Sequence, residues 1–169
     1  MRQDPPAIGS ELEQLTAFLD YQRETVLGKA EDLDAEQFRR TLPPSSLTIG
    51  GLLNHLALVE DSWFRERFSG LPEGELWAGV DWKSDPDFEF RTAAELDPDV
   101  LRQRYRDACA RSREIVAQAE DLDQVSVGAW PDGTHWNLRW MLVHMIEETA
   151  RHAGHADLLR ESIDGSVGE

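Results

Sequence analysis

Two side chains that can bind a divalent metal lie four residues apart near the C-terminal end of the chain. Glu148 and His152 fall in the run from Met145 to His155, which has the spacing of a helix. Four residues make about one helical turn, so both side chains are expected on one face, roughly 6 Å apart along the axis. His55, in an earlier apolar segment, offers a second imidazole. Two imidazoles and one carboxylate form a ligand set typical of a divalent metal with an open coordination position.

The predicted helix faces put these three residues at the edge of the core. At about 100° per residue, His152 falls inside the apolar stripe of the last helix and Glu148 lies at its border. His55 lies at the border of the inner stripe of its own helix. A glutamate in such a place is costly unless it has a partner. A metal is one partner, and an ion pair or hydrogen bond with Arg139 or Arg102 is the other.

The remaining histidines leave alternatives open. His155 follows His152 by three residues and could be a ligand or an orienting partner, a role that Asp157 could also take. His144 precedes the glutamate by four residues and could replace His152 in the pair. His135 lies in a predicted loop and is expected at the surface.

Four segments show the three- and four-residue apolar spacing of long amphipathic helices. They span approximately residues 10–29, 48–68, 97–120 and 137–163. A capping box at Ser10, an Asp97 followed by proline, and an Asn137 that can act as a cap mark three of the helix starts. With few strand signals, the pattern predicts an all-α four-helix bundle in a single domain covering residues 1–169.

Two connecting segments, 71–97 and 122–136, are predicted to be irregular, and a short helical turn is expected after Asp34. The first segment is unusually rich in large aromatic residues, namely Trp77, Trp82, Phe88 and Phe90. We therefore expect it to fold back over the body of the protein, where it either packs over one end of the helices or closes a pocket. The second segment contains a Pro-Asp-Gly turn.

Composition narrows the partners. A formal charge of −16 argues against nucleic acid and against anionic membranes. No apolar run approaches the ~20 residues that span a bilayer, and the N-terminal segment lacks the features of a signal peptide. A cytoplasmic location is therefore expected. Cys109 is the only cysteine, which excludes an internal disulfide. It is predicted to be buried, a catalytic thiol being the alternative.

Two segments resemble motifs of the DinB-like superfamily. Residues 138–157 are similar to its last helix, and residues 49–56 to its second-helix motif. The resemblance covers nearly the whole chain. Within the superfamily, the chain looks more specifically like an actinobacterial branch. It implies a four-helix bundle of up-down-down-up topology, often dimeric, with a metal bound by His55, Glu148 and His152. Many relatives have histidine where this chain has Glu148. In this respect the chain resembles the metal-binding domain of mycothiol-dependent maleylpyruvate isomerases, whose ligands are also two histidines and a glutamate. Those enzymes have a further C-terminal domain that is not in this sequence, so maleylpyruvate is not the expected substrate.

The resemblance implies a metal-dependent thiol S-transferase in which mycothiol attacks an electrophilic small molecule. Zinc is the first choice of metal, and nickel, iron and manganese are compatible with the same ligands. Arg139 and Arg160 could bind a carboxylate of the cosubstrate, with surface salt bridges as the alternative. Trp63 and Trp140 could line the pocket or pack in the core. A metal-dependent hydrolase and a non-catalytic metal-binding stress-response protein remain the competing interpretations.

Overall fold

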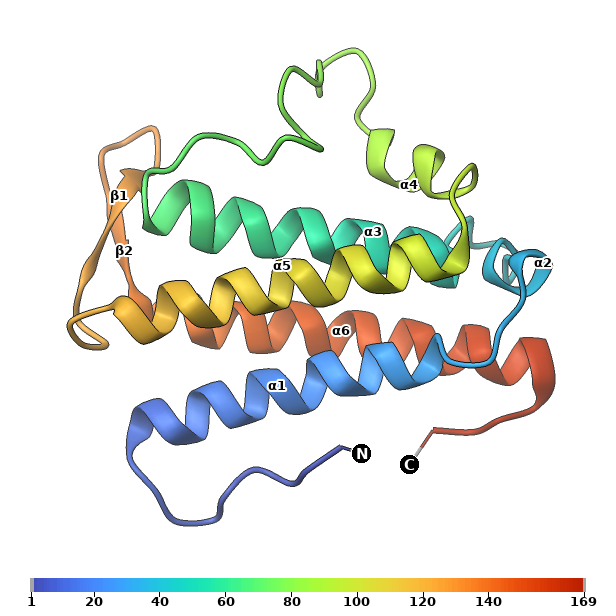
Figure 1. Ribbon diagram of the computed structural model, residues 1–169, viewed down its shortest axis with the longest axis horizontal. Helices are drawn as coiled ribbons and strands as arrows, with labels where there is room; N and C mark the ends of the chain where they lie inside the picture. The colour runs from blue at the N-terminus through green and yellow to red at the C-terminus, as the bar shows by residue number, and fades with distance from the viewer. Residues whose placement is uncertain (1, 169) are drawn as a thin grey trace.

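Long helical stretches lie side by side in the computed structural model, which describes residues 2–168 (Figure 1). They are α1 (Glu11–Lys29), α3 (Ile49–Glu60) with its continuation η1 (Asp61–Phe68), α5 (Pro98–Gln118) and α6 (Leu138–Asp164). These bounds agree with the predicted ones to within about two residues. The mainly helical fold predicted from the apolar spacing is therefore confirmed. Met1 and Glu169, the ends of the predicted domain, lie outside the described residues.

The helix ends follow the capping residues of the sequence. Ser10 and Glu13 form the predicted capping box at the start of α1. The Asp97 side chain accepts a hydrogen bond from Asp99 N, and Asn137 Oδ1 accepts one from Trp140 N at 2.9 Å. Each cap satisfies a backbone N–H that the helix itself leaves unpaired. Local chemistry thus determines where α1, α5 and α6 begin.

The second long helix changes character half-way along. It is α-helical to Glu60 and continues as the π-helix η1 to Phe68. The sequence predicted one helix over this range and did not predict the π-helical part. Ser69 N donates to Phe64 O at 3.2 Å, a bond over five residues instead of four. Asp61, the first residue of this stretch, is buried, and its carboxylate pairs with Arg111 of α5 at 2.9 Å.

The prediction of an irregular segment at 122–136 was wrong, and the all-α prediction did not include the small sheet that this segment forms. Strand β1 (Val125–Ala129) pairs antiparallel with β2 (His135–Asn137) across a turn at Gly133, whose φ is +85°. The strands are short and mostly exposed, so they lack the long alternating pattern that predicts a sheet. Trp136, which faces the helices, is buried. The two-stranded sheet thereby covers one end of the helical body, next to η1 (Figure 1).

The segment between η1 and α5 folds back over α3, as its aromatic residues predicted (Figure 1). Trp77 is buried, and its indole N–H donates to Asp61 Oδ2 at 3.3 Å. The segment is not wholly irregular, because it contains the short helix α4 (Phe88–Ala93). The turn expected after Asp34 is present as α2 (Ala35–Phe38). Among the described residues, no helix is long and apolar enough to cross a membrane.

A buried ion pair links two of the long helices inside the core. Arg23 of α1 donates from Nε and Nη2 to the two carboxylate oxygens of Glu60, at 2.8 and 2.6 Å. The Glu60 residue is fully buried and Arg23 is 3% exposed. Cys109 of α5 lies beside this pair, with Sγ 3.9 Å from Glu60 Oε1. Arg23 Nη1 also donates to the half-exposed Asp20 at 2.8 Å, so it is the buried Glu60 carboxylate that depends on the pair for its solvation.

Candidate metal centre

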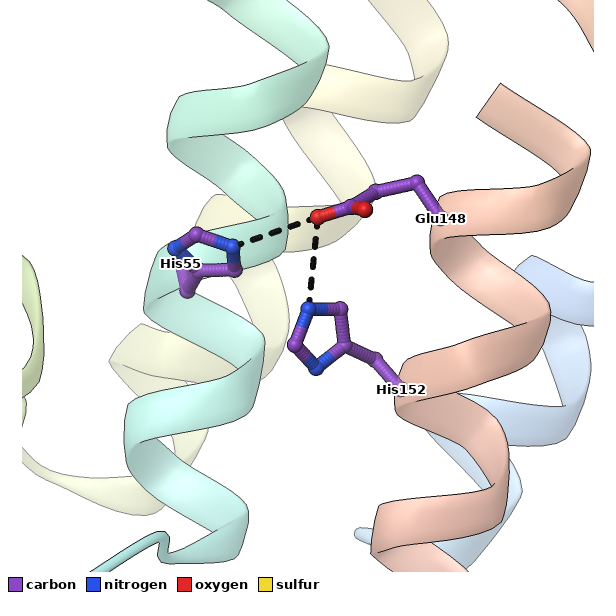
Figure 2. Close-up of side chains that lie close together, drawn as sticks. All are labelled: His55, Glu148 and His152. Carbon is purple, nitrogen blue, oxygen red and sulfur yellow. Dashed lines mark ion pairs between the residues drawn. The ribbon is translucent and has the colours of Figure 1, made fainter. Parts of the chain in front are cut away.

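His55, Glu148 and His152 meet in the space between α3 and α6. Figure 2 shows the two imidazole rings turned toward one oxygen of the Glu148 carboxylate. His55 lies on α3, and the other two lie one turn apart on α6. The predicted i,i+4 relationship and the predicted inward position of His55 therefore bring the three side chains together.

The distances between the three side chains fit a small metal ion. Glu148 Oε1 lies 3.5 Å from His55 Nε2 and 3.3 Å from His152 Nε2. One donor atom from each residue lies within 4.8 Å of the others. Ligands at ~2.1 Å from a tetrahedral ion are about 3.4 Å apart. The residues present thus fit a zinc-like ion with three protein ligands, and small shifts of the side chains would complete the geometry.

The site is half-buried, which strengthens its electrostatics. The side chains of His55 and Glu148 are each 20% exposed. Hydrogen bonds from His152 and His55 hold the pKa of Glu148 well below its ordinary value. Burial acts to lower the pKa of His55, but hydrogen bonds with Glu148 and Glu89 outweigh burial and raise it. An ionised carboxylate beside two imidazoles is the donor chemistry typical of a site for a divalent cation.

Sequence reasoning missed two residues that hold His55. Glu89 Oε1 lies 3.0 Å from His55 Nδ1, and the Phe90 ring stacks on the imidazole at 5.0 Å between centroids. Both belong to α4, inside the segment predicted to be irregular. The only available signal was an acidic residue between two aromatic ones, Phe88 and Phe90, and this pattern alone is weak.

Of the other histidines, His155 contacts a candidate ligand, whereas His144 and His135 do not. His155 Nδ1 lies 3.3 Å from His152 Nδ1, in the orienting position that was one of its two predicted roles. Burial and the neighbouring His152 lower the pKa of His155. His144 lies outside the three-residue group, with its ring stacked on Trp140 at 5.2 Å. His135 is exposed, as predicted.

The other candidate polar residues lie in contacts of their own. Arg139 pairs with Glu11 and Asp123, so it is not the partner of Glu148. Arg160 pairs with Asp164 and also donates to backbone carbonyls at the end of α1. Arg102 likewise donates to the Ala30 and Leu33 carbonyls. Asp157 pairs with Lys29 at 2.7 Å instead of orienting an imidazole.

Aromatic residues of η1 and α6 pack together next to the hairpin. Trp63 contacts Trp140 and His144, with ring centroids 5.6 and 4.6 Å apart. Trp63 also lines a cavity of about 310 Å³ together with Trp82. Val59, one turn beyond His55 on α3, lines the same cavity. Trp63 therefore borders an open space that begins about one helical turn from His55. Trp140, which is half-exposed, packs against the Trp63 ring.

Comparison with known proteins agrees with this architecture. A family model described as mycothiol-S-transferase matches residues 14–165. The chain belongs to the mycothiol-S-transferase family. This family is DinB-like, so the resemblance found in the two sequence motifs is confirmed. The family match includes the segments that carry His55, Glu148 and His152.

A solved structure of a conserved protein from Enterococcus faecalis has the same fold. It is 15% identical to this chain, and the match covers 94% of this chain and 100% of that one with a TM-score of 0.68. At this identity the likeness concerns the fold alone. No curated protein sequence matches this chain.

Proposed function

We propose that this protein is a divalent-metal-dependent S-transferase that uses a low-molecular-weight thiol, mycothiol, to modify an electrophilic small molecule. The observation that carries the proposal is the convergence of His55, Glu148 and His152 on one point, in a chain of the mycothiol-S-transferase family. The family supports the thiol, and the ligand set supports the metal. We further propose that the long helices form a DinB-like four-helix bundle of up-down-down-up topology.

The three converging residues would hold the metal and leave one position open for the cosubstrate. A metal bound there would keep the cosubstrate sulfur deprotonated at neutral pH. Zinc suits two imidazoles and one carboxylate, and nickel, iron(II) and manganese are compatible with the same donors. Glu148 contributes a negative charge that offsets the charge of the ion. The half-buried position limits the access of water to the site.

The proposed reaction is a nucleophilic transfer. The thiolate sulfur forms a bond to an electrophilic carbon while the bond from that carbon to its leaving group breaks. The sulfur must come from outside the chain, because Cys109 is 1% exposed and burial raises the pKa of its thiol. Cys109 also lies beside the Arg23–Glu60 pair, away from the three ligands.

Recognition of the cosubstrate remains a prediction for Arg139 and Arg160. Both guanidinium groups have acidic partners in the protein, and each lies eight or nine residues from the nearest ligand on α6, which is about 12–14 Å along the axis. Each arginine is replaced by Gln in turn. If its guanidinium group binds a carboxylate of the thiol cosubstrate, the variant should have a raised KM for the thiol, and an unchanged KM would show that it does not. A cytoplasmic location and a homodimer are likewise proposals, and sedimentation of the purified chain tests the latter.

Metal analysis with matched variants tests the proposal. Protein purified without an affinity tag and loaded with zinc should retain about one ion per chain, and His55→Ala and His152→Ala should not. The loaded protein should transfer mycothiol to a reactive bimane dye, with activity lost in both variants. His135→Ala is the control, since this exposed histidine lies outside the group.

Other outcomes would point to the competing functions. Turnover of esters or amides without added thiol would indicate a hydrolase that uses the same ligands. Stoichiometric metal with no turnover in either assay would indicate a metal-binding protein without catalysis. Absence of metal from the loaded wild type would overturn both enzyme functions together.

A further inference from the structure

We propose that Glu89 of α4 is a positioning residue for the metal centre, acting through His55. This inference rests on the proposed metal site, but it concerns a residue outside the ligand set. The Glu89 carboxylate accepts a hydrogen bond from Nδ1–H of His55 at 3.0 Å. The opposite nitrogen of the same ring, Nε2, is the atom that faces Glu148.

The Glu89 carboxylate is held in an apolar place with one polar partner. Glu89 is 5% exposed. Its Oε1 faces His55, while its Oε2 is buried with no hydrogen-bond partner among the described residues. Burying a carboxylate with half of its hydrogen-bonding capacity unused is costly. Its position is therefore better explained by what it does to His55 than by the stability it adds.

Contacts on the backbone of α4 fix where this carboxylate lies. The side-chain amide of Asn54, the residue before His55, donates to Glu89 O at 2.7 Å. Asn54 is fully buried, and its own oxygen accepts a hydrogen bond from Arg104 at 2.6 Å. Arg104, on α5, thereby connects the third long helix to the same arrangement. Two consecutive residues of α3 thus hold Glu89, one by its backbone and one by its side chain.

The ring of His55 is fixed at its edge by Glu89 and on its face by Phe90. The Phe90 and His55 planes differ by 17°, so the rings are stacked. Gly51 makes this approach possible, since a Cβ atom there would lie 3.0 Å from the Phe90 ring. Held in this way, the ring has little freedom to rotate.

The hydrogen bond also decides which nitrogen of His55 can bind a metal. With the proton on Nδ1, the lone pair of Nε2 is free and points toward Glu148 and His152. A carboxylate acceptor at the far nitrogen increases the basicity of a ligand imidazole and fixes its orientation. The short helix α4, from the segment between η1 and α5, would therefore tune a site built on α3 and α6.

Zinc affinity measured by competition with a chromophoric chelator tests this role. Glu89→Leu removes the acceptor and should weaken zinc binding about 10- to 100-fold. Glu89→Gln keeps an oxygen that can accept from Nδ1–H, and should recover most of that loss. Glu95→Leu and Glu95→Gln are the matched controls, because Glu95 is an exposed glutamate just after α4. Both should bind zinc like the wild type.

The visible spectrum of the cobalt-substituted protein shows whether Glu89 positions His55 at the metal or only attaches α4 to α3. Glu89→Gln should shift the ligand-field bands relative to the wild type and to Glu95→Gln, at unchanged helical content by circular dichroism. If Glu89→Leu does not fold, the affinity and spectrum of Glu89→Gln decide the question. Wild-type affinity and an unshifted spectrum in the Glu89 variants would overturn the inference while leaving the metal site intact. A wild type that takes up no metal would overturn the proposed function and this inference together.

Discussion

Nδ1 of His155 lies 3.3 Å from Nδ1 of His152, one turn further along α6. His152 Nε2 faces Glu148, so in the tautomer that leaves Nε2 unprotonated for a metal, Nδ1–H of His152 donates a hydrogen bond to Nδ1 of His155. His155 thus accepts a hydrogen bond from Nδ1 of His152, as Glu89 accepts one from Nδ1 of His55. The difference is that the acceptor is a neutral imidazole and not a carboxylate. Both imidazoles of the proposed site have their far nitrogen engaged by the protein.

His155→Phe should weaken zinc binding about 10-fold, less than removal of a ligand. Phenylalanine can keep the edge contact between the two rings, which have centroids 5.3 Å apart, but it has no nitrogen to accept a hydrogen bond. Chelator competition measures the effect, with His135→Phe as control. Equal affinities in the two variants would show that His155 has no part in orienting His152.

Zinc should raise the thermal unfolding temperature of the wild type. At a free concentration 100 times its Kd, a ligand that binds only the folded state adds about 2.7 kcal/mol, which for a chain of this size is a rise of roughly 5–11 °C. Differential scanning calorimetry with and without zinc measures the rise. In His152→Ala the rise should vanish, and an equal rise there would place the metal elsewhere.

Cys109→Ala should leave mycothiol transfer unchanged and lower the free energy of unfolding by about 1 kcal/mol, because it removes one buried atom. The native wild type should also fail to react with a thiol reagent until it is unfolded, since Cys109 is 1% exposed. A steady-state assay and reaction with Ellman's reagent provide the measurements. Loss of transfer in a folded variant would make Cys109 the nucleophile and contradict an external thiol.

Arg23→Met should destabilise the protein by about 3–5 kcal/mol, because it leaves the Glu60 carboxylate buried without its partner. The double variant Arg23→Met with Glu60→Leu should cost less than Arg23→Met alone, since no charge is then buried. Urea unfolding at pH 7 measures the variants. A double variant as unstable as the sum of both single ones would show that the two residues act independently.

In metal-free protein, Glu148→Gln should lower the free energy of unfolding more at pH 5.5 than at pH 9. The pKa of folded His55 is raised, so stabilisation by its protonated form is complete below the unfolded pKa and is lost as the pH rises through the folded one. The pKa of Glu148 is lowered, so its contribution is lost only far into the acid range. Melting temperatures of both proteins in EDTA give the comparison. A difference independent of pH would contradict a charged pair.

Residues that follow helical periodicity were predictable from the sequence. Glu148 and His152 had to share a face of α6 because four residues make a turn, and the apolar neighbours of His55 turned it inward. The assignment of these three as metal ligands stays a prediction that the geometry supports. The starts of α1, α5 and α6 followed from single capping residues.

Features that depend on distant contacts were not predictable in the same way. The burial of Glu89 depends on contacts of α4 with α3, such as the hydrogen bond from Asn54, 35 residues earlier, to the Glu89 backbone. The hairpin strands are too short to be read with assurance from their alternation, and in β1 the burial runs against it, with Val125 and Val127 exposed and Ser126 buried. The π-helical turns of η1 leave the apolar spacing of the second helix nearly unchanged, and only hydrogen bonds such as Ser69 N to Phe64 O reveal them.

The π-helical stretch has a consequence for comparing relatives of different length. A wider turn accommodates an extra residue without displacing what comes before or after it. A relative one residue shorter between Asp61 and Phe68 could run as an ordinary α-helix and still present its equivalents of His55 and Phe68 in the same places. Alignments across the family should therefore allow a single-residue gap at this point before any downstream position is treated as equivalent.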